Sequence, residues 1–595
     1  MFYNILSDFT VGGKNLIRKL MKSIRQYWKA SVLSLIFIIG EVILEVVIPF
    51  ITSDMVNRIQ AGAQMDMILK SGGIITAAAI LSLVCGALAG TFSAKASAGF
   101  AGNLRADMFS KVQKFSFGNI DKFSTSSLVT RMTTDITTVQ NAYMMMIRIA
   151  VRAPLMFAFA IVMAYVLGGS LATTFVVVVP VLAIGLLIIG KLAMPAFRAV
   201  FKKYDKMNES IEENVRGMRV VKGFAREDYE KDKFGKASDN IRLDFTKAEK
   251  IVGLNSPLME MCLHFNVVFV LYIGSKLAIE SHGVTVNIGQ ISALMTYGFM
   301  VLMSLMMVSM IYVMLTMSVE AAKRIVEVLD ETPSISNPAE PVMEVRDGSV
   351  DFTDVAFRYS EKASRDALFD IDLHIDSGMS VGILGGTGSS KTTLIQLIPR
   401  LYDVTSGEVK VGGVPVKDYD IKTLRDAVSV VLQKNELFSG TIAENLRWGN
   451  ENASDEELVE ACKIAQAYEF VSQFPEGFET HIEQGGTNVS GGQKQRLCIA
   501  RALLKKPKIL ILDDSTSAVD TRTDALIRKG FMEYIPETTK IIIAQRVASV
   551  QECDMIIIMD GGKIMGTGTH KELLKSNEIY REIYEEQTKG GSGDE

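Results

Sequence analysis

The sequence has few cysteines and almost no net charge. Its five cysteines, spread over 595 residues, show no C-x-x-C spacing, so neither a zinc site nor a disulfide framework is indicated and we expect reduced thiols. A net charge of -4 gives no argument for a nucleic-acid partner. The N-terminus shows no cleavable signal peptide. The cysteines are Cys85, Cys262, Cys462, Cys498 and Cys553.

The composition differs between the first and second halves of the chain. With 48% hydrophobic residues, 22% charged residues and a mean hydropathy of +0.23, the chain is too apolar for an ordinary soluble protein and too charged to lie entirely in a membrane. Long apolar runs dominate up to about residue 320, and mixed composition follows. The sequence therefore predicts a membrane half followed by a soluble half.

Six apolar stretches in the first half are long enough to span a membrane. They lie at 30–52, 71–96, 143–168, 171–197, 251–278 and 287–318. Each reaches the ~20 residues that an α-helix needs to cross ~30 Å of hydrocarbon. Fourteen Lys and Arg lie between residues 198 and 250, whereas the loop 53–70 carries two. The positive-inside rule therefore places the long loops, both termini and the soluble half in the cytoplasm. We expect the polar helical segment 201–233 to project beyond the bilayer as a stalk.

A basic amphipathic segment precedes the first span. Apolar residues recur at helical spacing from Leu16 to Trp28, and basic residues from Lys14 to Lys29 occupy the other face. A calmodulin-target helix has a similar pattern, but a spanning segment follows at once. This favours a helix that lies in the membrane interface, with Tyr27 and Trp28 at headgroup level.

Several ionisable residues lie inside the predicted spans. They include Glu41 and Glu45 in the first span, Arg148 and Arg152 in the third, and Glu260 and His264 in the fifth. A charge at mid-bilayer is costly unless it finds a partner or faces water. The alternatives that stay open for them are pairing within the bundle, a water-filled inward cavity, or a site for cationic substrates.

The sixth span carries methionines three to four residues apart. They are Met303, Met306, Met307, Met310, Met314 and Met317. Methionine suits promiscuous apolar surfaces, but it also fills irregular gaps between packed helices. Both interpretations stay open here as well.

The soluble half contains a phosphate-loop pattern. Val381–Leu384 indicates a short buried strand that runs into the glycine-rich loop Gly385–Thr392, and a helix follows. Backbone N–H groups and the helix N-terminus suit phosphates, Lys391 supplies a positive charge, and the Thr392 hydroxyl suits magnesium. Ser390 stands where G-x-x-x-x-G-K-[ST] has its last glycine. We expect nucleotide binding with altered affinity, because glycine there permits backbone angles that are costly for serine.

Further motifs follow in an order that resembles the ATP-binding-cassette (ABC) exporters. Tyr359 matches the family's adenine-stacking aromatic residue, and Gln433 matches its glutamine loop. Ser490–Arg496 matches the signature and Ser517–Asp520 the D-loop. Asp513, at the end of an apolar strand, matches the magnesium-directed aspartate. The resemblance covers nearly the whole chain and implies a half-transporter. Its fold would be an α-helical polytopic membrane domain with six transmembrane helices plus an α/β P-loop NTPase cassette.

The resemblance implies ATP and Mg²⁺ as cofactors and a set of site residues. The nucleotide-binding residues are Tyr359, Gly385, Gly386, Thr387, Gly388, Ser389, Ser390, Lys391, Thr392, Thr393 and Gln433. The magnesium ligands are Thr392, Gln433 and Asp513. The hydrolytic positions are Asp514 and Gln545, and Ser490, Gly491, Gly492 and Gln493 form the signature that acts in a partner's site. The segments 115–127 and 215–224 resemble the family's coupling helices.

Three positions depart from the family pattern while the signature is intact. The family usually has Glu at position 514, His at 545 and glycine at 390; Gln484 also stands where exporters usually keep a glutamate. Cassettes of this family pair head to tail, so that each ATP lies between one subunit's phosphate loop and the other's signature. We therefore expect a heterodimer, in which this chain carries a degenerate ATP site and lends its signature to a competent partner.

The resemblance implies a bacterial plasma-membrane exporter of hydrophobic or amphipathic compounds. An ATP-gated channel or sensor on the same scaffold stays the alternative. The predicted segments are a tail with an interfacial elbow helix (1–29), a transmembrane domain with two long cytoplasmic loops (30–325), a linker (326–345), the cassette (346–585) and a disordered tail (586–595).

Overall fold

The computed structural model describes residues 14–281, 286–360, 363, 365–514 and 519–590. The chain divides into two compact units. The membrane unit runs to Gln113 and continues over Ser124–Glu331, and the cassette unit combines Lys114–Phe123 with the chain from Thr332 onward.

The membrane unit is helical throughout its described residues. Its elements are α2 (Lys14–Met21), η2 (Lys22–Tyr27), α3 (Trp28–Gln60), α4 (Met65–Val112), α6 (Thr125–Thr130), η3 (Arg131–Asp135), α7 (Ile136–Gly168), η4 (Gly169–Thr173), α8 (Thr174–Arg216), α9 (Met218–Gly223), α10 (Glu227–Val252), α11 (Asn255–Glu280) and α12 (Ile288–Asp330). Among the described residues, six helices are long and apolar enough to cross a membrane, which confirms the predicted number of spans.

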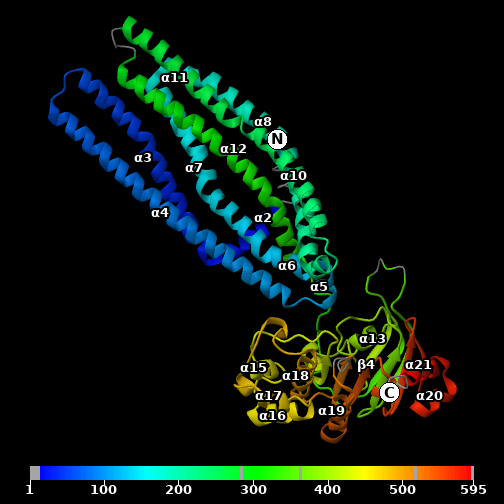
Figure 1. The fold of residues 1–595 in the computed structure, drawn as a ribbon. Helices are drawn as coiled ribbons and strands as arrows, with labels where there is room; N and C mark the ends of the chain where they lie inside the picture. Colours follow the sequence, from blue (N-terminus) through cyan, green and yellow to red (C-terminus); the bar gives the residue numbers. More distant parts are fainter. Residues whose placement is uncertain (1–13, 282–285, 361–362, 364, 515–518, 591–595) are drawn as a thin grey trace. The chain divides into compact units, whose positions relative to one another are not determined.

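The spanning helices pack through an apolar core. Figure 1 shows α3 and α4 running side by side, and α7 packs against both of them and against α12. Tyr297 of α12 is fully buried and donates its hydroxyl to the Val46 carbonyl oxygen of α3 at 2.8 Å. A buried phenol needs such a partner, and the bond fixes α12 against α3.

The predicted stalk segment over 201–233 is helical but is not one continuous helix. α8 ends at Arg216, the short α9 follows, and α10 starts only at Glu227. Ala225 has a positive φ of 49°, which a right-handed helix does not accommodate. Acidic residues in the first turn of α10, including Glu227 and Asp228, favour a new helix N-terminus there.

The predicted elbow helix is bent rather than continuous. Arg25 has φ 42° and ψ -123°, between α2 and the start of α3. Its guanidinium bonds Asp107 of α4, and Ser23 donates its hydroxyl to the same carboxylate at 2.8 Å. A partner distant in sequence therefore sets the bend, which the local amphipathic pattern cannot reveal.

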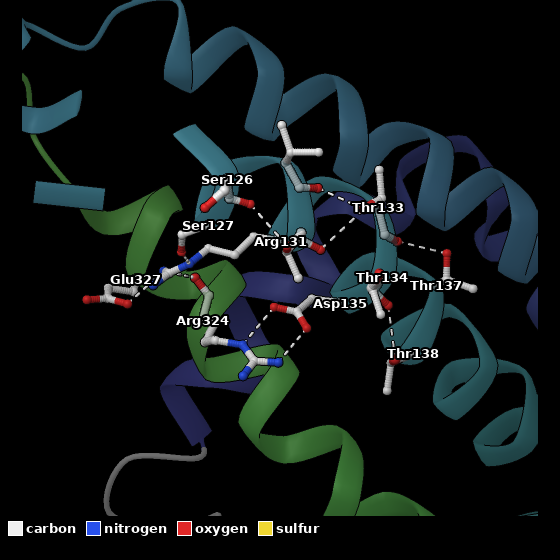
Figure 2. A network of polar contacts seen from close by, with 12 residues as sticks. Ser126, Ser127, Arg131, Thr133, Thr134, Asp135, Thr137, Thr138, Arg324 and Glu327 are labelled. Atoms are coloured by element: carbon white, nitrogen blue, oxygen red, sulfur yellow. Dashed lines mark hydrogen bonds and ion pairs between the residues drawn. The ribbon is translucent and has the colours of Figure 1, made fainter. Parts of the chain in front are cut away.

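A polar network joins the start of α7 to the end of α12 (Figure 2). Asp135 is buried and accepts hydrogen bonds at 2.6 and 2.8 Å from the guanidinium of Arg324. Arg131 donates at 2.7 Å both to Glu327 and to the Arg324 carbonyl oxygen. The segment η3 between Arg131 and Asp135 is a turn of π-helix, a rare form that often marks functional positions.

The cassette unit contains α/β structure. Its elements are α5 (Phe117–Phe123), β1 (Val350–Phe357), β2 (Leu368–Ile375), β3 (Ser380–Gly385), α13 (Lys391–Leu397), β4 (Ser406–Val411), β5 (Val414–Pro415), α14 (Ile421–Ala427), β6 (Val428–Val431), β7 (Gly440–Thr441), α15 (Ile442–Arg447), α16 (Asp455–Ile464), α17 (Tyr468–Gln473), η5 (Gly477–Glu479), β8 (His481–Ile482), η6 (Gln484–Gly486), α18 (Gly491–Leu504), β9 (Ile509–Asp513), α19 (Thr521–Tyr534), β10 (Thr539–Ile543), η7 (Val547–Ser549), β11 (Met555–Asp560), β12 (Lys563–Gly568), α20 (His570–Ser576) and α21 (Glu578–Gly590).

The main sheet is mostly parallel. Its strand order is β12-β11-β3-β10-β9-β6, and only β12 pairs antiparallel. β3, β9 and β10 are nearly continuous runs of buried residues, as expected of parallel strands covered on both faces. A second, antiparallel sheet has the order β2-β1-β4-β5. Within this unit, Figure 1 shows α15, α16, α17 and α18 grouped apart from α20 and α21.

Two predicted segment boundaries need correction. α12 continues to Asp330, so the first residues assigned to the linker 326–345 are helical. α21 continues to Gly590, so the first half of the tail 586–595 is helical too, and residues 591–595 lie outside the described residues. Both helices extend through polar sequence that hydropathy alone does not assign.

Candidate nucleotide site

The candidate site lies where the parallel strands end. β3 leads into the loop after Gly385, β9 ends at Asp513, β10 ends two residues before Gln545, and β6 ends two residues before Gln433. β3, β10, β9 and β6 are consecutive neighbours in the sheet. Their carboxyl ends therefore bring four separate sequence motifs to one edge, which is where α/β sheets bind ligands.

The phosphate loop is folded around its lysine. Lys391 opens α13, and its ammonium donates to the carbonyl oxygens of Gly385 and Gly386 at 2.9 and 2.8 Å and to Ser389 Oγ at 3.2 Å. A Cβ at Gly385 would lie 2.1 Å from the Met559 carbonyl oxygen, so the loop requires glycine there. Burial lowers the pKa of the Lys391 ammonium, and the nearby Asp513 and Asp514 carboxylates oppose that shift. These bonds hold the ammonium within the loop, and the lysine of such a loop contacts the β- and γ-phosphates of a nucleotide.

Ser390 adopts the conformation that the glycine of the motif would supply. Its φ of 70° and ψ of 24° lie in the left-handed region, at the N-cap of α13. A non-glycine residue there is strained by about 1–2 kcal/mol. The backbone of the loop is therefore retained despite the substitution, at a cost that glycine would avoid.

A candidate magnesium site joins the phosphate loop to β9. Thr392 donates its hydroxyl to both carboxylate oxygens of Asp513, at 3.1 and 3.0 Å. Burial raises the pKa of the Asp513 carboxyl, and the Thr392 hydrogen bond acts in the opposite direction. A hydroxyl beside a carboxylate is the donor set that Mg²⁺ takes beside nucleotide phosphates. These two residues fit the ion.

Asp514 lies beside two side-chain amides, each of which comes two residues after another strand of the sheet. Gln545 donates its side-chain N–H to Asp514 Oδ2 at 2.7 Å, and Gln433 approaches the same oxygen at 3.5 Å. The backbone N–H of Asp514 donates to the Ile543 carbonyl oxygen of β10 at 3.0 Å. Two of the three positions that depart from the family pattern, 514 and 545, are therefore in direct contact.

An aromatic cluster lies beside the phosphate loop and reaches α5. Tyr359 is 52% exposed, and its hydroxyl shares a 2.9 Å hydrogen bond with Thr393. Tyr402 packs edge-on against Tyr359, with ring centroids 5.2 Å apart. Its hydroxyl donates to Asp121 of α5 at 2.7 Å, and burial and this carboxylate raise the pKa of the Tyr402 hydroxyl. The exposed Tyr359 ring is free to stack on a base while its hydroxyl is held in place.

Sequence analysis missed Tyr402 and the α5 contacts. Asn119 of α5 donates to the Thr332 carbonyl oxygen at 3.0 Å and accepts the Ser334 backbone N–H at 3.1 Å. These pairs are distant in the chain, and no local pattern signals them. They fix α5 to the first residues after α12.

The signature residues form the start of α18. Ser490 is the N-cap: its hydroxyl accepts the Gln493 N–H at 3.3 Å, and its own N–H donates to the Gln493 side chain at 2.9 Å. This capping box leaves Gly491 exposed and Gly492 half-buried. The free N–H groups of a helix N-terminus with small residues suit an anion such as a phosphate. Ser517 and Ala518 of the D-loop lie outside the described residues, whereas Asp520 caps α19 by accepting the Thr523 N–H at 2.9 Å.

Comparisons with known proteins give matches to both halves of the chain. Residues 31–319 match the family described as ABC transporter transmembrane region, and residues 368–517 match the family described as ABC transporter. The uncharacterized ABC transporter ATP-binding protein YfiB of Bacillus subtilis is 33% identical over 571 residues, which are 96% of this chain and 98% of that protein. An uncharacterized ABC transporter ATP-binding protein of Mycobacterium tuberculosis is 32% identical over 587 residues, 97% of this chain and 100% of the relative. Among solved structures, a bacterial Atm1-family ABC exporter with ATP bound superposes with a TM-score of 0.80 at 22% identity, covering 95% of this chain and 98% of that one.

Proposed function

Because the chain belongs to the ABC transporter family, as an exporter half-transporter with a cytoplasmic ATP-binding cassette, we propose that it is the degenerate-site subunit of a heterodimer. In this proposal, ATP binds between the phosphate loop of this chain and the signature of its partner, and is hydrolysed slowly there. The faster site consists of the partner's phosphate loop and the signature of this chain. Closure of the two cassettes on ATP then drives export.

The observation that carries this proposal is the arrangement around Asp514. A glutamate at this position would place its carboxylate about 1.5 Å further out, the length of one carbon–carbon bond. The shorter Asp514 carboxylate accepts a 2.7 Å hydrogen bond from Gln545. A carboxylate that is retracted and already accepts an amide is a poor general base for the attacking water. Gln545 itself lacks the protonated form that imidazole provides.

The binding parts of the site are not altered in the same way. Lys391 lies within the phosphate loop, Thr392 lies beside Asp513, and Ser390 has the left-handed backbone that the glycine of the motif would supply. The capping box between Ser490 and Gln493 keeps the signature open to a phosphate. This combination supports tight ATP binding with slow hydrolysis in the chain's own site, and full support of hydrolysis in the partner's site.

The proposed cargo is a hydrophobic or amphipathic compound. Met303, Met306 and Met307 of α12 are only partly buried, and Met310 is 61% exposed. Flexible, polarisable methionine side chains can fit apolar molecules of varied shape. The Met317 side chain lies outside the described residues.

The test is phosphate release by the purified chain without any partner. We expect Mg²⁺-dependent ATP binding but almost no hydrolysis. Lys391→Ala is the control that shows the bound nucleotide to be in this site. The complex purified from the native membrane through a tag on this chain should hydrolyse ATP readily. Fast phosphate release by the lone chain would contradict the proposal.

A further inference from the structure

The charged residues that α3 and α7 bring together are unevenly paired. Arg152 donates to both carboxylate oxygens of Glu45, at 2.7 and 2.9 Å, and its other terminal nitrogen lies 3.5 Å from Glu41. One guanidinium therefore contacts two carboxylates. This geometry supports pairing within the bundle over a site for cations, because neither carboxylate is left without a cationic neighbour.

Arg148, one turn before Arg152 on α7, makes no direct bond within this cluster, although its charge acts on Glu41 at longer range. Over the described part of the chain it makes no hydrogen bond or ion pair, and its side chain is exposed. The Glu41 carboxylate does not bond Arg148, because it is buried against α4. A Cβ at Gly86 would lie 3.0 Å from Glu41 Oε1, so only glycine leaves room for that position. The bundle thus holds a guanidinium with unused donors.

Arg148 does not reach the cytoplasmic interface. Its guanidinium lies at Gly90 of α4, where an added Cβ would be 4.0 Å from Nη1. Gly99, on the same helix, packs against the ring of Tyr27, which precedes the interfacial Trp28. Nine residues of helix separate Gly90 from Gly99, or about 13 Å. Lys95, by contrast, is exposed and lies one turn from Gly99, so we expect its long side chain to extend to the headgroups.

We propose that Arg148 binds the anionic group of an amphipathic molecule, a carboxylate or phosphate on an apolar body. The planar guanidinium offers paired N–H donors that match either group. A charged side chain at this depth does not face lipid and therefore marks a polar pathway. Ile147, which precedes Arg148, lies in an apolar cluster against which Phe92 of α4 packs. Phe92 stacks on Phe37 of α3 with ring centroids 5.7 Å apart, so these side chains supply an apolar surface nearby. This inference rests on the proposed export function and names the class of its cargo.

The test is equilibrium binding of a fluorescent amphiphile to the full chain in phosphatidylcholine nanodiscs, with empty discs subtracted. The probe is 11-(dansylamino)undecanoic acid, and its matched controls are the neutral amide and the trimethylammonium analogue of the same length. We expect the acid to bind about 10-fold or more tighter than the amide, as for a charge-assisted hydrogen bond. Arg148→Gln should remove that preference and Lys95→Gln should leave it unchanged.

Several results would overturn the proposal. They are equal binding of acid and amide by the unaltered chain, tighter binding of the ammonium compound, or an equal effect of the two variants.

If Arg148→Gln is not monodisperse, Arg148→Lys replaces it, and we expect an intermediate preference because lysine lacks the planar fork. If phosphatidylglycerol in the discs competes with the acid, the natural ligand is a bilayer lipid. If it does not compete, the natural ligand is a compound from outside the bilayer. Either result supports an anion site at Arg148. Because the assay uses neither ATP nor a partner, its failure leaves the proposed ATP-site asymmetry untouched.

Discussion

Restoring a longer carboxylate and an imidazole should convert the proposed degenerate site into a hydrolytic one. Asp514→Glu moves the carboxylate by about 1.5 Å, and a misplacement of that order costs ~10²-fold in rate, or about 2.7 kcal/mol. The 2.7 Å hydrogen bond from Gln545 is a second restraint. A hydrogen bond to a charged group contributes about 1.5–3 kcal/mol, and because it stabilises the ionised form it makes the carboxylate a weaker base. Because the two residues are in contact, their effects will not simply add. We expect about 10²-fold from Asp514→Glu alone and about 10³-fold when Gln545→His is added.

The assay needs a complex whose other site is silent. Ser490→Arg in this chain provides it, because an arginine at the start of α18 blocks the signature that serves the partner's ATP. Phosphate release is then measured in that background with each single variant and with the double variant. Gln545→His alone is the control and should change little, since the aspartate is still too short. A double variant that stays at the background rate would refute the assignment of the deficit to these two positions.

Three further perturbations test the fold and the loop. Asp135→Ala should lower the free energy of unfolding by about 1.5–3 kcal/mol, because a buried carboxylate loses two bonds from the half-exposed Arg324. Glu327→Ala should cost at most about 1 kcal/mol, because the Glu327 carboxylate is half-exposed and Arg131 keeps its bond to the Arg324 carbonyl oxygen. Thermal unfolding in detergent compares the two variants, and equal losses would contradict the burial argument. The ring N–H groups of His374 donate to the carboxylates of Asp351 and Asp376, which raises the pKa of His374. Its contribution to stability is therefore complete below pH ~6.5 and is lost as pH rises through the folded-state pKa. His374→Gln should lower the melting temperature slightly at pH 6 and not at pH 9. Ser390→Gly should tighten ATP binding, because it removes the strain of the left-handed backbone, and should not raise the rate of hydrolysis. An unchanged affinity for ATP would show that this strain does not affect nucleotide binding.

The parts of the chain that short motifs describe could be predicted from the sequence. The loop Gly385–Thr392 follows a buried strand and precedes a helix, so local geometry alone implies its shape. Asp513 and Gln545 follow apolar runs, and parallel strands bring their carboxyl ends together. The six spans could be predicted because their length and apolarity are properties of single segments.

The remaining features depend on partners far away in the chain. The bend at Arg25 is set by Asp107, and the pairing of Asp135 with Arg324 joins residues 189 apart. Helix ends in polar sequence, such as Asp330 of α12, carry no hydropathy signal. The hydrogen bond between Gln545 and Asp514 also joins residues that are distant in the chain. The sequence shows that each of the two positions departs from the family pattern, but it does not show that they are in contact.

The most direct test of the proposed asymmetry compares two variants of the native complex. Phosphate release is measured with Asp514→Ala and with Ser490→Arg, each in this chain beside an unaltered partner. Asp514→Ala should scarcely reduce turnover, because the slow site contributes little, and Ser490→Arg should nearly abolish it. The opposite ranking, with Asp514→Ala the more damaging, would place the working hydrolytic site in this chain and contradict the account.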